Sequence, residues 1–264
     1  MKYQRGYWVE QMVAVKDKQN SAGRLLAIFH AVRHKQAPNK VGRDLWGSVL
    51  NVDEVAQPLG ERRIASRLEA INRELDSMNE ALSNMDVPEH LYGPTIRVLM
   101  EAASATTLRV NWSGNIREEH VLCLGWAQHV LPCESEVIEA AAIAEMLATV
   151  QALKQQINDA EFPGPLKSFL DKHLRIIEAA LDDYSISGAI PLADAIDGLL
   201  AETIGRKTAI GEAYQSSSSQ QKSALQRFAD FAKSAEQIVK TAEVVGKYSM
   251  LAWDKGVHML HWLQ

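Results

Sequence analysis

Three side chains near the C-terminus have the types and the spacing of metal ligands. Asp254, His258 and His261 lie four and three positions apart, so on a helix they share one face. Carboxylate and imidazole groups are ordinary ligands of Zn²⁺. The same face continues upstream through alternating acidic and basic residues: Glu236, Lys240, Glu243 and Lys247. Because the two lysines oppose a bound cation, we interpret the three residues as part of a charged stripe and predict no metal site and no cofactor.

Arg24 and His30 suggest a second kind of chemistry. The pair resembles the loose arginine–histidine motif of the all-helical HEPN ribonucleases, and that resemblance implies that the two residues hold and protonate RNA phosphate oxygens at a dimer interface. Arginine binds anions and histidine titrates near neutral pH, which suits such a role. Residues six apart lie about 240° around a helix axis, however, and do not share a face. An HEPN-like ribonuclease that uses Arg24 and His30 is therefore an alternative hypothesis.

Other catalytic signatures are missing from the sequence. The stretch Gly205–Thr208 resembles the end of a phosphate-binding loop, but Leu200 stands where that motif requires its first glycine. The sequence contains no Glu-x-x-His for a di-iron bundle and no Gly-x-Ser-x-Gly nucleophile elbow. His173 falls among leucines and isoleucines, as a hydrogen-bonded core histidine does. These absences favour a non-enzymatic protein, with an enzyme as the alternative.

Composition restricts the kinds of partner. The chain has 264 residues, 47% hydrophobic residues and a net charge of −5, which provides no basic footprint for nucleic acid. Cys123 and Cys133 form no CxxC pair, which indicates a reducing compartment. The first residues lack the apolar core of a secretory signal, and no window of about 18 apolar residues could span a membrane. We expect a cytoplasmic protein that binds proteins rather than nucleic acid.

Apolar residues recur at helical spacing along almost the whole chain, which predicts an all-α fold. We expect a helical bundle of about nine helices, with a long amphipathic C-terminal helix over 220–262. The clearest pattern is a heptad stripe that predicts a helix over 61–86 packed within the chain. Its members are Ile64, Leu68, Ile71, Leu75, Met78, Leu82 and Met85. Further helices are expected over 7–17, 21–36, 94–108, 117–131, 135–159 and 166–184, with a short one at Asp44 and another from Pro191.

Small residues recur every seven positions along the predicted C-terminal helix. This small-residue stripe consists of Ala235, Ala242, Ser249 and Gly256. Small side chains let another helix approach closely, so we interpret the stripe as an interaction surface, with its partner in the same chain or in another. The opposite arc carries Trp253, Val257, Leu260 and Leu263, and the mixture of acids and lysines on the polar face argues against peripheral membrane contact.

Phe162-Pro163-Gly164-Pro165 is the strongest break in the chain. It predicts an N-terminal helical subdomain over 1–161 and a C-terminal helical subdomain over 162–264, or one continuous domain. The segment LKSFLDKHLRIIEAALDDYSISGAIPLADAIDGLL resembles uncharacterised all-helical bacterial proteins in its cadence of helix, turn and helix. That resemblance implies a bacterial origin and an all-α architecture, and no functional residues.

The heptad stripe, the small-residue stripe and the missing catalytic motifs together favour a non-enzymatic interaction or assembly module that binds itself or another helical protein. Bacterial helical proteins of this kind occur in stress, toxin–antitoxin and phage-defence systems. Two alternatives remain: the HEPN-like ribonuclease, and an effector that acts on membranes through its C-terminal helix.

Overall fold

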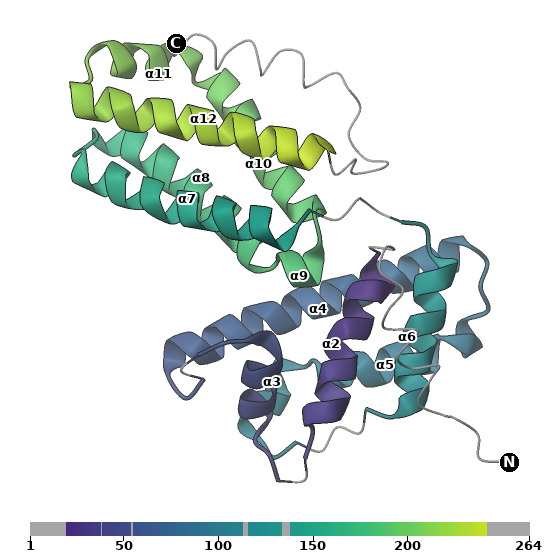
Figure 1. The fold of residues 1–264 in the computed structure, drawn as a ribbon. Helices are drawn as coiled ribbons and strands as arrows, with labels where there is room; N and C mark the ends of the chain where they lie inside the picture. The colour runs from purple at the N-terminus through teal and green to yellow at the C-terminus, as the bar shows by residue number, and fades with distance from the viewer. Residues whose placement is uncertain (1–19, 38, 54, 113–115, 134–137, 242–264) are drawn as a thin grey trace, which may run out of the picture. The chain divides into compact units, whose positions relative to one another are not determined.

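A computed structural model describes residues 20–37, 39–53, 55–112, 116–133 and 138–241 of the chain, and over these residues the protein is all-helical (Figure 1). They form eleven α-helices, α2 to α12, and two short 3-10 helices. The bridge between Val41 and Asn111 is the one β-type pairing among them. The all-α prediction is confirmed. The predicted count of about nine helices is not confirmed. The four-residue α9 and the nine-residue α11 were not expected, because such short segments show little helical periodicity in the sequence. The predicted helix over 7–17 and the last part of the predicted C-terminal helix lie outside the described residues.

The chain divides into two compact units. Unit 1 contains the residues up to Glu134 together with Ser185–Gly188, and unit 2 contains Ser135–Tyr184 and the residues from Ala189 onward. This division differs from the predicted one near residue 162. Gly164 and Pro165 open α8, so the Pro-Gly-Pro break is the turn between α7 and α8, both in unit 2. A strong local break marks the end of a helix, whereas a unit boundary depends on which apolar faces pair.

In unit 1, α2 packs against α3, α4 and α6, so it lies at the centre of this unit (Figure 1). The α-helices are α2 (Ser21–Lys35), α3 (Gly42–Leu50), α4 (Pro58–Asn84), α5 (Gly93–Ala102) and α6 (Glu118–Val130). The 3-10 helices are η1 (Glu89–Leu91) and η2 (Ala105–Arg109). The single helix expected over 94–108 is therefore two elements, because α5 ends at Ala102.

The heptad stripe of α4 lies inside unit 1. Ile64, Leu68, Ile71, Leu75, Met78 and Leu82 are all at most 1% exposed and belong to one hydrophobic cluster with residues of α2, α3 and α5. Met85, beyond the end of the helix, is 46% exposed. The predicted packing of this stripe within the chain is confirmed.

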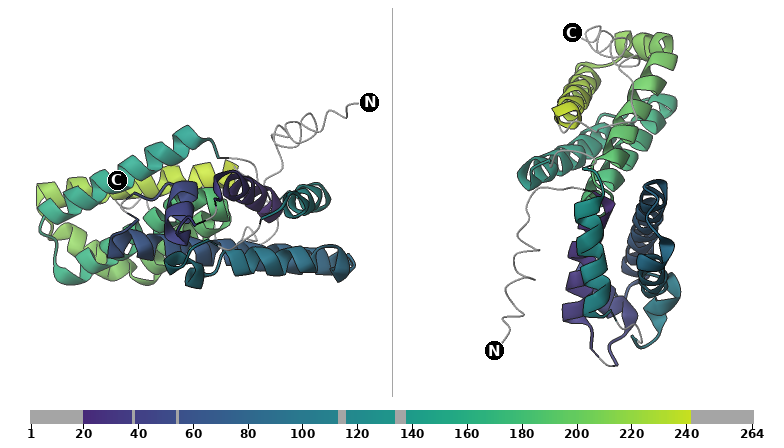
Figure 2. Two further views of the ribbon diagram at one scale, coloured as in Figure 1. Left: turned by 90° about the horizontal axis from the view of Figure 1, so that it is seen from below. Right: turned by 90° about the vertical axis from the view of Figure 1, so that its right-hand side faces the viewer.

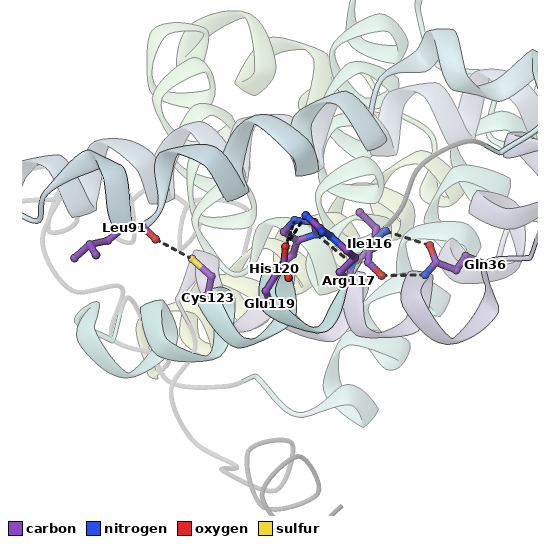
Figure 3. A network of polar contacts seen from close by, with 7 residues as sticks. All are labelled: Gln36, Leu91, Ile116, Arg117, Glu119, His120 and Cys123. Atoms are coloured by element: carbon purple, nitrogen blue, oxygen red, sulfur yellow. Dashed lines mark hydrogen bonds and ion pairs between the residues drawn. The ribbon is translucent and has the colours of Figure 1, made fainter. Parts of the chain in front are cut away.

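Two side-chain amides fix the ends of α2. Asn20 is fully buried; its Oδ1 accepts a hydrogen bond from the Gly23 N–H at 3.0 Å, which caps the helix, and its Nδ2 donates to the Gln128 carbonyl of α6 at 3.1 Å. At the other end, Gln36 Nε2 donates to the Ile116 carbonyl at 2.9 Å, and Gln36 Oε1 accepts from the Ile116 N–H at 3.2 Å (Figure 3). The central helix is thus hydrogen-bonded at both ends to the segment around α6.

Unit 2 is a four-helix bundle with a short additional helix. Each long helix packs against two neighbours, in the order α7, α8, α10, α12 and back to α7 (Figures 1 and 2). Gln221 Nε2, near the start of α12, donates to the Ala160 carbonyl at the end of α7 at 3.0 Å, so these two helices run antiparallel. The bounds are α7 (Ala140–Asp159), α8 (Gly164–Asp182), α10 (Ile190–Gly205), α11 (Lys207–Gln215) and α12 (Ser219–Thr241). The short α9 (Tyr184–Ser187) follows α8, and its last three residues belong to unit 1. An apolar core fills the bundle.

Candidate functional site

A groove of about 580 Å³ lies between the antiparallel helices α7 and α12 of unit 2. Its floor is apolar and consists of the buried side chains of Met146, Leu153 and Phe231. Its lining also includes residues with small side chains: Ala142, Ala148, Thr149, Ala152 and Ser234. A volume of this size, with an apolar floor and a few polar groups, is typical of a binding site. We refer to it below as the α7/α12 groove.

The rim of the α7/α12 groove carries charges of both signs. Glu145 comes from α7, and Arg227 and Asp230 come from α12. Because the helices run antiparallel, Glu145 lies toward the C-terminal end of α12 and Arg227 toward its N-terminal end. The residues that line the groove include neither histidine nor cysteine. The arrangement can therefore bind an apolar surface with polar flanks.

Arg24 lies in the interior of unit 1. Its guanidinium forms an ion pair with Glu74 of α4, and its Nε donates a hydrogen bond to the Ile186 carbonyl at 3.0 Å. The side chains are 6% and 11% exposed, respectively. An RNA phosphate would have to displace these partners in order to reach Arg24.

Gly188 approaches Arg24 closely. Its φ of +68° is in the left-handed region, and a Cβ at this position would lie 2.8 Å from Arg24 Nη1. Glycine is thus required here both by the backbone conformation and by the space that the guanidinium occupies.

His30 lies farther along α2, partly exposed, beside His34. The Nε2 atoms of these two rings are 3.2 Å apart. His30 and Arg24 therefore have different partners, and the structure records no interaction that joins them. The HEPN-like interpretation stays a prediction, which can be tested by comparing RNA cleavage by the wild-type protein and by His30→Ala.

Of the other predicted site residues, the structure describes only Ala235. It is fully buried in the core of unit 2, among side chains of the same bundle. The remaining members of the small-residue stripe, Ala242, Ser249 and Gly256, lie outside the described residues, and so do Asp254, His258 and His261.

His173 is a core histidine, as its position among apolar residues predicted. It is 2% exposed, and its Nε2 lies 3.0 Å from the carboxylate of Glu202, which also binds Lys172 and Arg206. Burial lowers the pKa of His173, and the nearby carboxylate opposes this effect only in part. The neutral ring then donates from Nε2 and leaves its Nδ1 lone pair inside the protein, where it has no hydrogen-bond partner among the described residues. This nitrogen is therefore enclosed by the protein and is not accessible to solvent.

A second group of charges joins α10 and α12. Burial raises the pKa of the Asp197 carboxyl, and the neighbouring carboxylates of Asp194 and Glu236 raise it further, whereas Lys240 lowers it. Glu236 is itself 2% exposed and forms an ion pair with Lys240 at 2.8 Å. Repulsion among these carboxylates therefore destabilises the bundle when all of them are ionised.

Within the described ranges, no group of three or more histidine, cysteine, aspartate or glutamate side chains could hold a metal ion. None of the helices in those ranges has the length and the apolar character needed to cross a membrane. No protein-family model matches the chain, and neither the curated proteins nor the solved structures provide a match. The candidate site is therefore argued from its own geometry.

The sequence analysis did not identify the α7/α12 groove. Its residues belong to helices that are distant in sequence, and half of the α7 residues in the lining are alanine or threonine, which have no distinctive chemistry. One signal was present. Ala141, Ala144, Ala148 and Ala152 occupy exposed positions of α7. The solvent-facing side of a helix usually carries charged or polar residues, so these exposed alanines were a sign that part of this face could bind a partner.

Proposed function

We propose that this protein is a non-enzymatic helical interaction module, in which the α7/α12 groove binds an amphipathic helix of a protein partner. The observation that carries the proposal is the apolar floor of the groove, formed by Met146, Leu153 and Phe231 between two antiparallel helices. Small side chains beside that floor permit a third helix to approach closely. Binding of a helix in a groove through apolar residues at three- and four-residue spacing is a recurrent mode of peptide recognition.

The charges at the rim define the chemistry of the partner helix. The Glu145 end of the groove favours a basic residue, whereas Arg227 and Asp230, one helical turn apart on α12, offer a partner for each sign of charge. Such rim charges contribute more to orientation and to the rate of association than to affinity. We therefore expect a partner helix with an apolar face and with a basic residue at the end that lies beside Glu145.

The two stripes that first suggested an interaction module are not the proposed surface. The heptad stripe is buried within unit 1, and Ala235 is buried within unit 2. The packing of the heptad stripe and of Ala235 stabilises the chain itself, and the other members of the small-residue stripe lie outside the described residues. The proposal therefore depends on the α7/α12 groove, whose walls include the exposed residues Ala148 and Ala152.

A site-specific photocrosslinking experiment tests this function. A photoreactive phenylalanine analogue is placed in the full chain at Ala148 or Ala152, and illumination in the native host should yield a discrete crosslinked protein. Ala179 is the matched control, because it is an exposed alanine of the same unit on α8 and is not part of the groove. The crosslink should disappear when Thr149→Arg places a long charged side chain in the groove while the helical circular dichroism spectrum is retained.

The crosslinked species also identifies the partner by mass spectrometry. A partner segment with the expected apolar spacing and a basic residue at one end supports the proposal. Products that are equally abundant at Ala179, or that persist in Thr149→Arg, would show that the groove is not the docking surface.

A further inference from the structure

Two histidines on α2 lie with their ring nitrogens close together. His30 and His34 are one helical turn apart, their Nε2 atoms are separated by 3.2 Å, and their ring centroids are 4.4 Å apart. We propose that His30 and His34 form a two-histidine chelating site for a divalent transition metal of the Zn²⁺, Ni²⁺ and Cu²⁺ class. This site is in unit 1 and is independent of the α7/α12 groove.

The distance between the two nitrogens is the distance that a shared metal requires. Histidine nitrogens bind Zn²⁺ at about 2.0–2.1 Å, and a tetrahedral angle at the metal then places two such nitrogens about 3.3 Å apart. The observed 3.2 Å is close to this value, so the side chains need little rearrangement. Histidines four residues apart on one helix also supply two of the ligands in the zinc-binding H-E-x-x-H motif.

The lowered pKa of His30 favours metal binding at neutral pH. Burial lowers the pKa of His30, and the charges of His34 and Arg33 lower it further. The neutral ring has a lone pair to offer a metal. Two cations beside these histidines in the sequence have other partners: Arg33 lies 3.5 Å from Glu118 of α6, and Lys35 Nζ donates to the Ser48 carbonyl at 2.6 Å. Their positive charge still opposes a bound cation and weakens the affinity.

Without metal, the short distance is explained by a hydrogen bond in which one Nε2–H donates to the other Nε2. A metal replaces that shared proton once both neutral rings carry their hydrogen on Nδ1. The donating ring moves its proton from Nε2 to Nδ1 through solvent, and no net proton is released.

The ligand set defines what the bound metal does. No third protein ligand completes a cluster with these histidines among the described residues, so water occupies the remaining positions. Ala31 follows His30, where the H-E-x-x-H motif carries the glutamate that acts as general base. The site therefore binds an exchangeable metal and lacks the adjacent carboxylate that hydrolysis would use.

Titration calorimetry with Zn²⁺ and with Ni²⁺ tests the site in the full chain. All variants carry His258→Ala and His261→Ala, so that the C-terminal histidines cannot contribute. This background should bind one metal ion per chain, and either His30→Ala or His34→Ala should weaken binding at least tenfold, because a single imidazole cannot chelate. His90→Ala is the matched control, since His90 is an exposed histidine of the same unit, and it should leave the affinity unchanged.

A second variant separates geometry from histidine content. Combining His34→Ala with Lys35→His keeps the number of histidines but moves the second ring away from the face of His30, and this protein should bind as weakly as His34→Ala. Electron paramagnetic resonance of bound Cu²⁺ should show two nitrogen ligands in the background protein and one in the single variants. Affinities within twofold of one another across these proteins would overturn the proposal and leave the pair as an imidazole–imidazole hydrogen bond.

Discussion

Replacing Glu74 by glutamine removes one charge from a pair that the interior of unit 1 encloses. Glutamine has nearly the same shape and still offers an oxygen to the guanidinium of Arg24, so the change creates no cavity. In the pair with Arg24, an amide then takes the place of the carboxylate. Because the side chain of Arg24 is only 6% exposed, water cannot replace the lost countercharge.

The expected loss of stability is large. Removing one member of a buried ion pair costs about 3–5 kcal/mol, and the retained amide hydrogen bond places Glu74→Gln near the lower end of that range. A change of about 3 kcal/mol reduces the equilibrium constant for folding more than a hundredfold. The effect belongs to unit 1, since Arg24, Glu74 and Ile186 all lie in it.

The assay must report on unit 1 separately, because a chain with two units need not unfold in one step. Among the described residues, the tryptophans at 46, 112 and 126 all belong to unit 1, and Trp46 is fully buried. Urea titrations followed by tryptophan fluorescence should therefore show the lower midpoint of Glu74→Gln. The C-terminal tryptophans at 253 and 262 are replaced by phenylalanine in all proteins compared.

The double variant Arg24→Met with Glu74→Leu is the control. Replacing both partners by apolar residues removes the uncompensated charge, so we expect its stability to return to near the wild-type value. If Glu74→Gln costs less than 1 kcal/mol, the guanidinium is solvated or differently paired and the reasoning is wrong. The same holds if the double variant is no more stable than the single one.

Three further predictions concern single positions. Gly188→Ala should destabilise unit 1 by about 1–3 kcal/mol in the same urea assay, because it combines a left-handed backbone with a contact to the buried guanidinium. A loss below about 0.5 kcal/mol would contradict this account. Leu75→Ala should lower the free energy of unfolding by about 2–5 kcal/mol, because Leu75 is fully buried. Met85→Ala, at a half-exposed position, should lower it by under about 1 kcal/mol, and equally small losses in both variants would place the heptad stripe in solvent. Asp197→Asn should raise the thermal midpoint near pH 7. The folded state raises the pKa of this carboxyl above its ordinary 3.8, so its ionisation lowers stability as the pH rises through the raised pKa. The gain should therefore disappear toward about pH 4, and a gain that is the same at both pH values would refute the assignment.

Local patterns in the sequence predicted the helices well. The heptad stripe of α4 gave the correct buried face, and the leucines around His173 gave its buried position, because helix periodicity is a property of a single segment. The end of the predicted helix over 94–108 was wrong. No proline or glycine marks the point at which α5 ends, so tertiary packing rather than local sequence ends the helix.

Pairings between distant segments could not be read from the sequence in the same way. Arg24 and Glu74 are 50 residues apart, and each stands beside leucines that define a buried face, which was the available signal. The sequence contains no pattern that predicts the ion pair between Arg24 and Glu74. The α7/α12 groove is a similar case, since it exists only because two helices about 80 residues apart in the sequence pack side by side.

The assignment of Ser185–Gly188 to unit 1 has a consequence for synthesis on the ribosome. The core of unit 1 includes Ile186, yet residues 135–184, with α7 and α8, are made before it. Domains encoded without interruption can complete their folding as soon as they emerge. Here the first unit stays incomplete, with Arg24 still lacking the Ile186 carbonyl, until half of the second bundle has left the exit tunnel. A chain released at residue 134 would therefore contain every helix of unit 1 numbered up to α6 and still lack part of its interior.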